Sequence, residues 1–409
     1  MDSNIKTVLN IKEFKHFLIG RFVFIMGLRM MGTLVAWWMY ELTGDAFYIG
    51  MLGLAEAIPA VGLSLYGGYI VDKTEKRKLL LIAASLFGIC ATVLLAVSTQ
   101  WFQQAFGIKI IMIVVYAVIF CTGIIRAFSG PAFGAIIASL VPRAFLITAS
   151  QLSSTSWLVA SIVGHAVAGF LIAWLHTTGT FYVIITLIGI GILFLSKLTT
   201  KPVGISNERK TFEAVAEGLK YVFETKEVLA ALSLDLFAVL FGGAVAMIPV
   251  FAKDILHVGP IGFGWLNAAT DIGSIIMVIA LTISPMKKMQ GIKLLMAVAG
   301  FGACIIVFGL STLYWLSFIA LLISGVLDGV SVVVRGNIVQ LKTPDALRGR
   351  VMSVNSMFIN SSNEIGQFES GVAAKLMGVV PSVVFGGCMT ILVVAVTWFK
   401  APTLKKLEY

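Results

Sequence analysis

The stretch Gly67-Gly68-Tyr69-Ile70-Val71-Asp72-Lys73-Thr74-Glu75-Lys76-Arg77-Lys78 lies between two long apolar segments of this 409-residue chain. Small residues at the end of the first apolar segment are followed at once by an acidic residue and then by a short basic turn. A connection this short holds its two flanking helices close together, and its basic residues are typical of a cytoplasmic loop. The stretch therefore predicts a tight, charged connection between two membrane-spanning helices.

The composition of the whole chain is that of a membrane protein. Hydrophobic residues make up 59% of the sequence and charged residues 12%, and the mean hydropathy is +0.99. A soluble domain of this size has no way to cover so much apolar surface, so we expect an all-α polytopic membrane protein. The apolar runs predict twelve spans of about 20 residues each. These spans lie near residues 17–40, 48–71, 79–98, 108–139, 146–175, 179–200, 227–252, 261–285, 292–311, 314–341, 350–377 and 380–400.

The net charge of +10 is distributed along the chain as in a membrane protein. If the N-terminus is inside the cell, nearly all basic residues outside the spans are cytoplasmic, and only Lys109 and Lys253 face the other side. This pattern predicts a multi-pass protein of the inner (plasma) membrane with both termini in the cytoplasm. It argues against nucleic acid as a partner.

The sequence shows no sign of a metal site, a cofactor site or an enzymatic centre. The four cysteines stand singly in apolar spans, without metal-ligand spacing, and no stretch resembles a nucleotide-binding loop. We therefore expect no cofactor, no catalytic residues and no use of ATP.

Residues 201–226 form the one long polar segment inside the sequence. Apolar residues recur there at helical spacing, opposite charged residues, which predicts an amphipathic helix on the cytoplasmic surface. The apolar residues are Phe212, Val215, Ala216, Leu219, Val222 and Phe223. We expect an N-terminal six-helix bundle at residues 1–200, this linker at 201–226, and a C-terminal six-helix bundle at 227–409.

The two halves of the chain resemble each other. A shift of 202 residues places Gly164 on Gly366 and Gly169 on Gly371, and a shift of 214–215 aligns the first two spans with the seventh and eighth. These shifts also place three intramembrane charges on three others: Arg21 on Asp235, Glu56 on Asp271, and Arg126 on Asp328. The pattern predicts two pseudo-symmetric bundles, the arrangement of many secondary transporters.

The stretch between the second and third spans resembles a signature of the major facilitator superfamily of secondary transporters. The residues that fit the signature are Gly68, Ile70, Asp72, Lys73, Lys76 and Arg77, whereas Glu75 stands where glycine is usual. Within the superfamily the chain is similar to the branch of enterobactin exporters and macrolide efflux pumps. The residues that carry this similarity are Arg126-Ala127-Phe128, Pro131-Ala132, Leu140 through Arg143, Ile248 through Asp254, Gln340-Leu341, and Pro344 through Val351.

The resemblance implies transport by alternating access, with a substrate site near the middle of the membrane. It also implies a cytoplasmic gate in which Asp72 lies near the start of the eleventh helix. The gate candidates are Gly68, Asp72, Lys73, Lys76, Arg77 and Arg350.

Charged residues inside the spans are the candidates for proton coupling or substrate contact. A charge at mid-membrane costs about 2.5–3.5 kcal/mol, so it persists where it has a function or a partner. Glu56 and Asp271 lie near the membrane centre, where a carboxylate that alternates between burial and a cationic partner binds and releases a proton. The alternative is a fixed ion pair, and Arg29 lies at the depth needed to pair with Glu56. For Asp235 and Arg21, nearer the cytoplasmic ends, structural pairing is the favoured reading.

Five further positions complete the candidate set. Arg126 and Asp328 are related by the repeat, and either proton transfer or pairing within a gate would suit Arg126. His165 replaces a proline usual in exporters of this superfamily, and it is either a core residue or a titrating one. The eleventh span carries a polar stripe that we expect to face a cavity or another helix, and Asn360 and Glu364 are its candidates. Trp37, Trp38 and Tyr40 are interpreted as an interfacial aromatic belt.

Together these features predict a monomeric secondary transporter. We expect it to export a small amphipathic molecule, such as a siderophore or drug, in exchange for protons. Its partners would be the lipid bilayer, the small-molecule substrate and the proton. An importer, a lysolipid flippase of the same superfamily and a non-transporting membrane sensor remain as alternatives.

Overall fold

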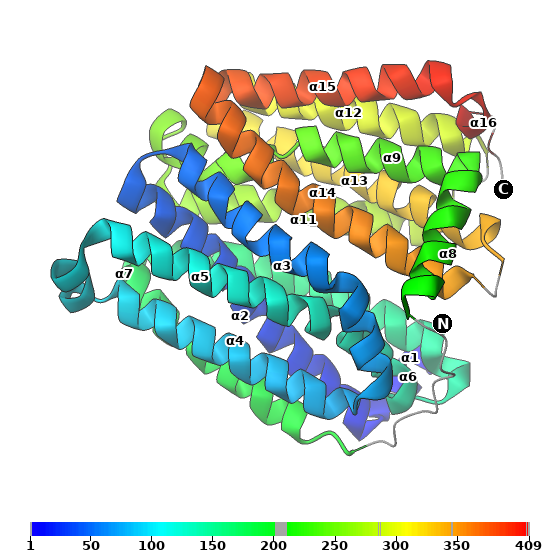
Figure 1. The fold of residues 1–409 in the computed structure, drawn as a ribbon, viewed down its shortest axis with the longest axis horizontal. Coiled ribbons are helices and arrows are strands. Elements are labelled where there is room, and N and C mark those ends of the chain that lie inside the picture. The colour runs from blue at the N-terminus through cyan, green and yellow to red at the C-terminus, as the bar shows by residue number, and fades with distance from the viewer. Residues whose placement is uncertain are drawn as a thin grey trace. The chain divides into compact units, whose positions relative to one another are not determined.

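A computed structural model gives the structure of residues 2–200, 211–284, 286, 288–344, 347–405 and 407 (Figure 1). Every regular element among these residues is a helix, which confirms the predicted all-α fold. The side chains of residues 2–4, 64, 65, 69, 72, 211–215 and 244 lie outside the described part, and so does the first part of the predicted linker, residues 201–210.

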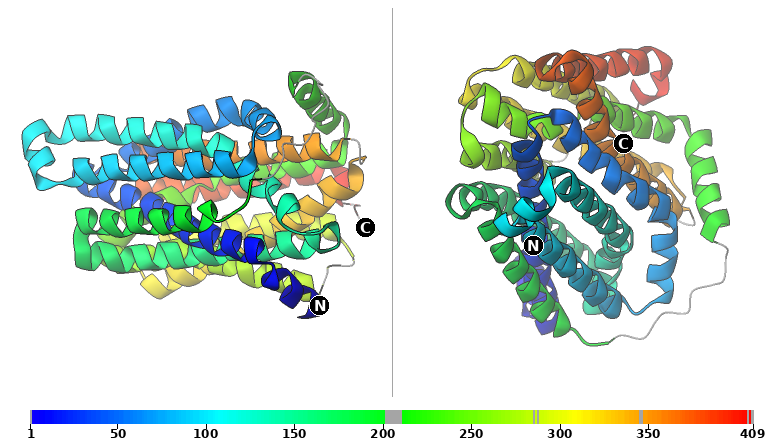
Figure 2. Two further views of the ribbon diagram at one scale, coloured as in Figure 1. Left: turned by 90° about the horizontal axis from the view of Figure 1, so that it is seen from below. Right: turned by 60° about the vertical axis from the view of Figure 1, so that its left-hand side comes forward.

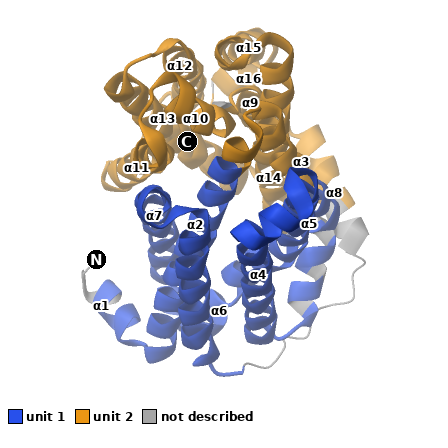
Figure 3. Ribbon diagram, turned by 90° about the vertical axis from the view of Figure 1, so that its left-hand side faces the viewer, with its two compact units in different colours: residues 1–38, 58–208 blue, residues 39–57, 209–409 orange. Residues whose placement is uncertain are grey.

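The chain divides into two compact units, which are described separately (Figure 3). The first unit contains Met1–Trp38 and Ile58–Glu208, and the second contains Met39–Ala57 and Arg209–Tyr409. The division therefore falls inside two long helices, α2 and α3. In α3 it falls beside Pro59, a residue that removes one helical hydrogen bond.

The first unit is built from long helices joined by short turns. Its elements, including the parts of α2 and α3 that extend into the second unit, are α1 (Asp2–Asn10), α2 (Lys12–Thr43), α3 (Ala46–Lys73), α4 (Lys76–Ser98), α5 (Gln100–Ala135), α6 (Ile137–Leu140), a 3-10 turn η1 (Arg143–Phe145) and α7 (Leu146–Ser196). These bounds agree with the predicted spans to within about five residues, with two exceptions. Helix α5 begins at Gln100 rather than near 108, with non-helical backbone at Gly107, and α7 contains two predicted spans.

The chain reverses direction in the middle of α7, at His176, whose φ is 56°. Along α2, Arg21 and Met26 lie against Ser153 and Gly164 of the first half of α7 in parallel order. The second half contacts α2 in the opposite order, since Gly20 lies against Gly191 and Gly27 against Ile184. The two halves can be followed by colour in Figure 2, and they correspond to the predicted spans 146–175 and 179–200.

The second unit contains the remaining elements. They are α8 (Thr211–Glu224), α9 (Lys226–Phe241), a 3-10 turn η2 (Ala244–Met247), α10 (Ile248–Val250), a π-helical turn η3 (Phe251–Ile255), α11 (Gly259–Ile283), α12 (Gln290–Leu310), α13 (Tyr314–Lys342), α14 (Arg348–Met377), α15 (Val379–Lys400) and α16 (Pro402–Lys405). An apolar core of valine, leucine, isoleucine and alanine side chains joins α8, α9, α12, α13, α14 and α15.

Ten helical segments among the described residues are long and apolar enough to cross a membrane, which confirms a multi-pass membrane protein. One of the ten, Arg143–Ser196, contains the reversal at His176. Helix α14 is not among the ten because polar residues occupy much of its length. The count of twelve spans remains a prediction.

The predicted internal repeat is present in the helix contacts. A Cβ atom placed on Gly164 would lie 2.9 Å from the carbonyl oxygen of Met26, and one on Gly366 would lie 2.9 Å from that of Leu240. The two glycines are related by the shift of 202 residues and their two partners by the shift of 214. Each unit therefore has the same close contact between equivalent helices.

Helix α8 is present in the described part of the predicted linker. Its face packs on α14, where Gly218 lies against the backbone of Arg350, and Val222 is fully buried. Phe223, predicted on the same apolar face, is 62% exposed. The interpretation of Trp37, Trp38 and Tyr40 as an interfacial belt is wrong, because each is at most 4% exposed and is enclosed by protein.

The C-terminal segment is held against the start of α12. Leu404 is fully buried and Leu407 is 6% exposed. A Cβ atom on Gly291 would overlap the carbonyl oxygen of Leu404, and the Gly291 N–H donates to the carbonyl of Leu407 at 3.4 Å. A glycine at position 291 is therefore what allows this segment to lie so close to α12.

Glu75 begins α4 as a capping residue, which explains why the usual glycine is not needed at this turn. Its φ is −64°, a value open to any residue, and its carboxylate accepts a hydrogen bond from the Lys78 N–H at 3.1 Å. This bond satisfies one of the unpaired N–H groups at the helix start.

Replacing Glu75 with alanine is expected to lower the stability of the first unit by about 1 kcal/mol, because the cap is lost. Thermal unfolding of the purified protein in detergent measures the change. Glu75→Ser is the matched control, since serine keeps a capping oxygen, and it should unfold close to the wild-type temperature. Equal loss in both variants would mean that the cap contributes nothing.

Candidate functional site

A buried polar site lies between α9 and α13 in the second unit. Asp328, Ser331 and Arg335 are three and four residues apart on α13, so they share one face of the helix. Arg335 forms an ion pair with Asp235 of α9, and their side chains are only 4% and 9% exposed. The Ser331 hydroxyl donates to the same carboxylate at 3.4 Å.

The helices that carry this site approach one another through glycines. A Cβ atom on Gly325 would overlap the carbonyl oxygen of Thr270, and one on Gly273 would overlap that of Leu322. This close approach of α11 and α13 brings Asp271 near enough to Asp328 for the two carboxyl groups to interact electrostatically.

Asp235 and Asp328 line one small cavity. Its other lining residues are Ala238, Val239, Val298, Phe301, Leu327 and Ser331. Asp328 makes no hydrogen bond or ion pair with any residue that the structure describes. The cavity therefore places an ion-paired carboxyl group and an unpaired one within the same apolar surroundings.

The polar stripe of α14 is divided between two environments. Ser356, Asn360 and Asn363 are exposed, whereas Glu364 is 4% exposed and Ser370 is 6% exposed. Exposed amides and hydroxyls are costly against lipid, so this row indicates a surface that faces water. Asn360 is thus on the water-facing part of the helix and Glu364 on the packed part.

Arg29 and His165 are brought together in the first unit. The Arg29 guanidinium lies 4.6 Å from the centre of the Trp157 ring, and Thr33 Oγ1 is 2.6 Å from His165 Nδ1. Because the Thr33 hydroxyl donates its hydrogen to the Arg29 carbonyl at 2.9 Å, the His165 Nδ1–H is the donor to Thr33. Gly164 allows this approach, since a Cβ atom there would lie 2.9 Å from Arg29 Cβ.

The remaining candidates are distributed over other helices. Glu56 lies in the part of α3 that belongs to the second unit, and Arg126 lies on α5 in the first. Arg21, for which structural pairing was favoured, donates to Ser153 and lies 5.5 Å from the Phe133 ring. Asp235 pairs with Arg335 instead, a residue that was not among the candidates predicted from the sequence.

The cytoplasmic gate candidates lie where α3 meets α4. Gly68 is in α3, Lys73 is its last residue, and Lys76 and Arg77 begin α4. The Arg77 side chain donates to the Ser196 carbonyl at 2.8 Å, at the end of α7. This geometry suits a cation at a helix C-terminus.

The two remaining gate candidates are Asp72 and Arg350. The side chain of Asp72 lies outside the described residues. Arg350, at the start of α14, forms an ion pair with Glu217 of α8. The connection between Asp72 and Arg350 therefore remains a proposal.

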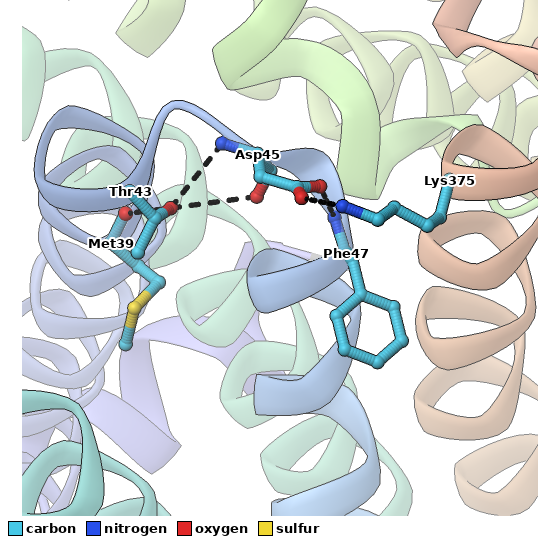
Figure 4. Close-up of polar contacts among 5 residues, drawn as sticks. All are labelled: Met39, Thr43, Asp45, Phe47 and Lys375. Atoms are coloured by element: carbon cyan, nitrogen blue, oxygen red, sulfur yellow. Dashed lines mark hydrogen bonds and ion pairs between the residues drawn. The ribbon is translucent and has the colours of Figure 1, made fainter. Parts of the chain in front are cut away.

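The turn joining α2 and α3 is held within the second unit by polar contacts (Figure 4). Gly44, with φ of 63°, ends α2. The next residue, Asp45, forms an ion pair with Lys375 of α14 and accepts a hydrogen bond from the Phe47 N–H at 3.0 Å, which caps α3.

A second polar contact reinforces this turn. The Tyr40 hydroxyl donates to Asp254 of η3, and Lys253 Nζ lies 5.5 Å from the centre of the Tyr40 ring. The turn from α2 to α3 is thus held at both α14 and η3 by charged groups.

Close to the Asp45–Lys375 ion pair, the backbones of α3 and α14 pack directly against each other. A Cβ atom on Gly50 would lie 2.8 Å from the Cα atom of Gly371. One turn further along α3, a Cβ atom on Gly53 would lie 2.6 Å from Gln367 Cβ. The sequence paired Gly371 only with its repeat partner, and this contact was not predicted.

The carboxyl group of Asp45 is held in its charged form. Burial raises its pKa, but the hydrogen bond from Lys375, the Phe47 N–H and the Lys375 charge together lower it more, so the pKa lies below the ordinary 3.8. A lowered pKa means that the contact stabilises the fold above the ordinary value and loses that contribution as pH falls through the lowered value.

Asp45→Asn is expected to lower the unfolding temperature modestly at neutral pH, because the pair is partly exposed and asparagine keeps the helix cap. The difference from the wild type should persist down to about pH 4 and disappear in stronger acid. Thermal unfolding in detergent over a pH series measures it. A difference that is unchanged in strong acid would contradict the ion-pair explanation.

Comparison with known proteins identifies a family for nearly the whole chain. Residues 7–408 match the family described as transmembrane secretion effector. The enterobactin exporter EntS of Shigella flexneri is 23% identical over 352 residues, covering 83% of this chain and 79% of the relative. The multidrug efflux pump Tap of Mycobacterium bovis is 21% identical over 354 residues, covering 84% and 82%.

A solved structure supports the fold. The nucleoside transporter NupG superposes with a TM-score of 0.77 at 14% identity, covering 95% of this chain and 99% of that protein. At this identity the likeness concerns the fold alone.

Proposed function

We propose that this chain, which belongs to the transmembrane secretion effector family of the major facilitator superfamily, exports a small amphipathic molecule in exchange for protons. The cargo class, a siderophore or a drug, is taken from the names of the relatives EntS and Tap. The protein would work as a monomer in the inner membrane, with both termini in the cytoplasm. Bundles at residues 1–200 and 227–409, joined by the linker at 201–226, would move by alternating access.

The observation that carries this proposal is the exposed polar stripe of α14. Ser356, Asn360 and Asn363 are exposed in a helix whose neighbours are apolar membrane spans. A carrier of amphipathic cargo needs such a surface, since polar groups bind the cargo's polar part while apolar neighbours bind the rest. On a lipid-facing helix, the same exposed polar groups would cost free energy.

The intramembrane charges supply the coupling in this proposal. Glu56, Asp271 and Asp328 are the carboxyl groups that would bind and release the proton. The other candidates would contact the cargo or gate the pathway: Arg29, Arg126, His165, Asn360 and Glu364 within the membrane, and Gly68, Asp72, Lys73, Lys76, Arg77 and Arg350 at the cytoplasmic side.

Proton movement in inside-out proteoliposomes that hold a pH gradient tests the proposal. Siderophores, antibiotics and lysolipids are added in turn, and a quenched dye reports the internal pH. We expect one cargo class to trigger proton release, and Glu56→Gln or Asp271→Asn to abolish it. Glu224→Gln, on the exposed face of α8, is the control and should behave as the wild type.

Each other outcome favours an alternative. Cargo movement without proton release would indicate a uniporter or a lysolipid flippase and would leave the acidic residues with structural roles. Cargo uptake in the opposite direction would indicate an importer. No movement of any cargo, in a protein that is folded, would favour a membrane sensor.

A further inference from the structure

The site between α9 and α13 holds one permanent cation and two carboxyl groups that face the same cavity. Arg335 remains protonated in proteins and is 4% exposed, so a buried carboxylate must balance its charge. Asp235 is that partner in this structure. The other carboxyl group, Asp328, has no ion-pair or hydrogen-bond partner among the described residues.

Charge balance fixes the protonation of this site. An unpaired carboxylate in a mostly apolar cavity within the membrane is strongly disfavoured. The lining that α12 contributes is apolar, from Val298 and Phe301. With one ion pair formed, the charges of the site balance when the remaining carboxyl group carries a proton.

The geometry allows a second arrangement of the same charges. Arg335 and Asp328 are seven residues apart on one face of α13, which is roughly 10 Å along the helix axis. Long side chains on a helix lean toward its N-terminus, so Arg335 leans toward Asp328. Ser331 lies between them on the helix and also lines the cavity, and its hydroxyl oxygen offers an intermediate hydrogen-bond acceptor.

We propose that Arg335 exchanges partners between Asp235 and Asp328 as one proton binds and another leaves, which makes this the proton-binding site of the second unit. When Asp235 takes up a proton from water, an O–H bond forms there and its negative charge is lost. Arg335 is released and pairs with Asp328, whose O–H bond breaks and whose proton leaves to water. One proton enters, one leaves, and the site keeps a single ion pair throughout.

This inference rests on the proposed proton exchange and deepens it by assigning the site. The exchange also reorganises the contact between α9 and α13, because the ion pair joins the two helices only in the first arrangement. In the second arrangement both charges lie on α13. Proton binding would thus loosen one helix from another, which is what a coupling site must do.

A double-mutant cycle on the purified full-length chain tests the exchange without any cargo. The variants are Asp235→Asn, Asp328→Asn and the double variant, and the measurement is the unfolding temperature in detergent. If Asp328 replaces Asp235 as the partner of Arg335, each single variant keeps an ion pair and the double variant keeps none. We expect the double variant to lose far more stability than the sum of the single losses.

Infrared spectroscopy of the same proteins gives a second readout. The wild type should show a neutral carboxyl band that Asp328→Asn weakens. Asp235→Asn should weaken it by the same amount, because Asp328 becomes the ionised partner of Arg335. Glu224→Gln should leave the band unchanged. In Arg335→Met, with no cation to balance, the band should instead grow, as Asp235 becomes neutral as well.

A fixed ion pair predicts different results. The stability losses of the two single variants would then add up to that of the double variant. Asp235→Asn would keep the neutral carboxyl band or fail to fold. Any of these outcomes would overturn the exchange. The flux assay separates this from the proposed function. Non-additive stability losses without proton-coupled flux would refute the exporter and leave the carboxyl exchange intact. Additive stability losses with normal flux would refute the exchange and leave the exporter intact.

Discussion

Gly325→Ala is expected to destabilise the second unit by about 3 kcal/mol or more, the upper end for forcing extra atoms into a packed core. The added Cβ atom would overlap the carbonyl oxygen of Thr270, and backbone has little freedom to yield. Helices α11 and α13 would have to separate, which would also disturb the relation of Asp271 to Asp328. Thermal or denaturant unfolding in detergent measures the effect.

Gly336→Ala is the matched control on the same helix. No atom lies within 4 Å of the position that its Cβ atom would take. Alanine also favours a helix over glycine by roughly 0.5–1 kcal/mol, so this variant should be at least as stable as the wild type. If both variants lost the same stability, the contact with Thr270 would not be the cause.

Gly50→Leu is expected to separate α3 from α14 in the second unit and to stop transport. Even a Cβ atom at this position would lie 2.8 Å from the Cα atom of Gly371, and a full leucine side chain has no space. The ion pair between Asp45 and Lys375 would then be lost as well.

Thiol labelling measures the separation directly. In a chain whose native cysteines are replaced, Gln367→Cys should react slowly with a maleimide, because Gly53 covers this side chain. Adding Gly50→Leu should raise the labelling rate at least several-fold. Gly62→Leu, at a position on α3 with no atom within 4 Å, is the control and should leave the rate unchanged. Slow labelling in the Gly50 variant would show that the contact tolerates the side chain.

The long apolar runs predicted the helices well because burial in a membrane depends on local composition. The ends of α12, α13 and α15 agree with the predicted spans to within two residues. The reversal at His176 falls in the gap between the predicted spans 146–175 and 179–200. The repeat was also found from sequence, since Gly164 and Gly366 are small for the same physical reason in both units.

The partners of charged residues were harder to predict. Arg335 stands at helical spacing from Asp328 and Ser331, but helical spacing alone does not show that a cation near a helix end is buried. Asp45 and Lys375 are 330 positions apart, and nothing in the local sequence of either indicates the other. Tyr40 was assigned to the interface by residue type, whereas its contact with Asp254 depends on how distant segments pack.

The burial of Leu404 and Leu407 beside Gly291 affects how the protein can be handled in the laboratory. A purification tag that replaces the residues after 401, or a chain shortened to that point, would lack Leu404 and Leu407. The apolar core would lose these two side chains, and the start of α12 would be uncovered. Such a protein should express at lower yield and aggregate sooner in detergent than one tagged at the N-terminus. A tag placed after Tyr409 on a flexible spacer would leave this core intact.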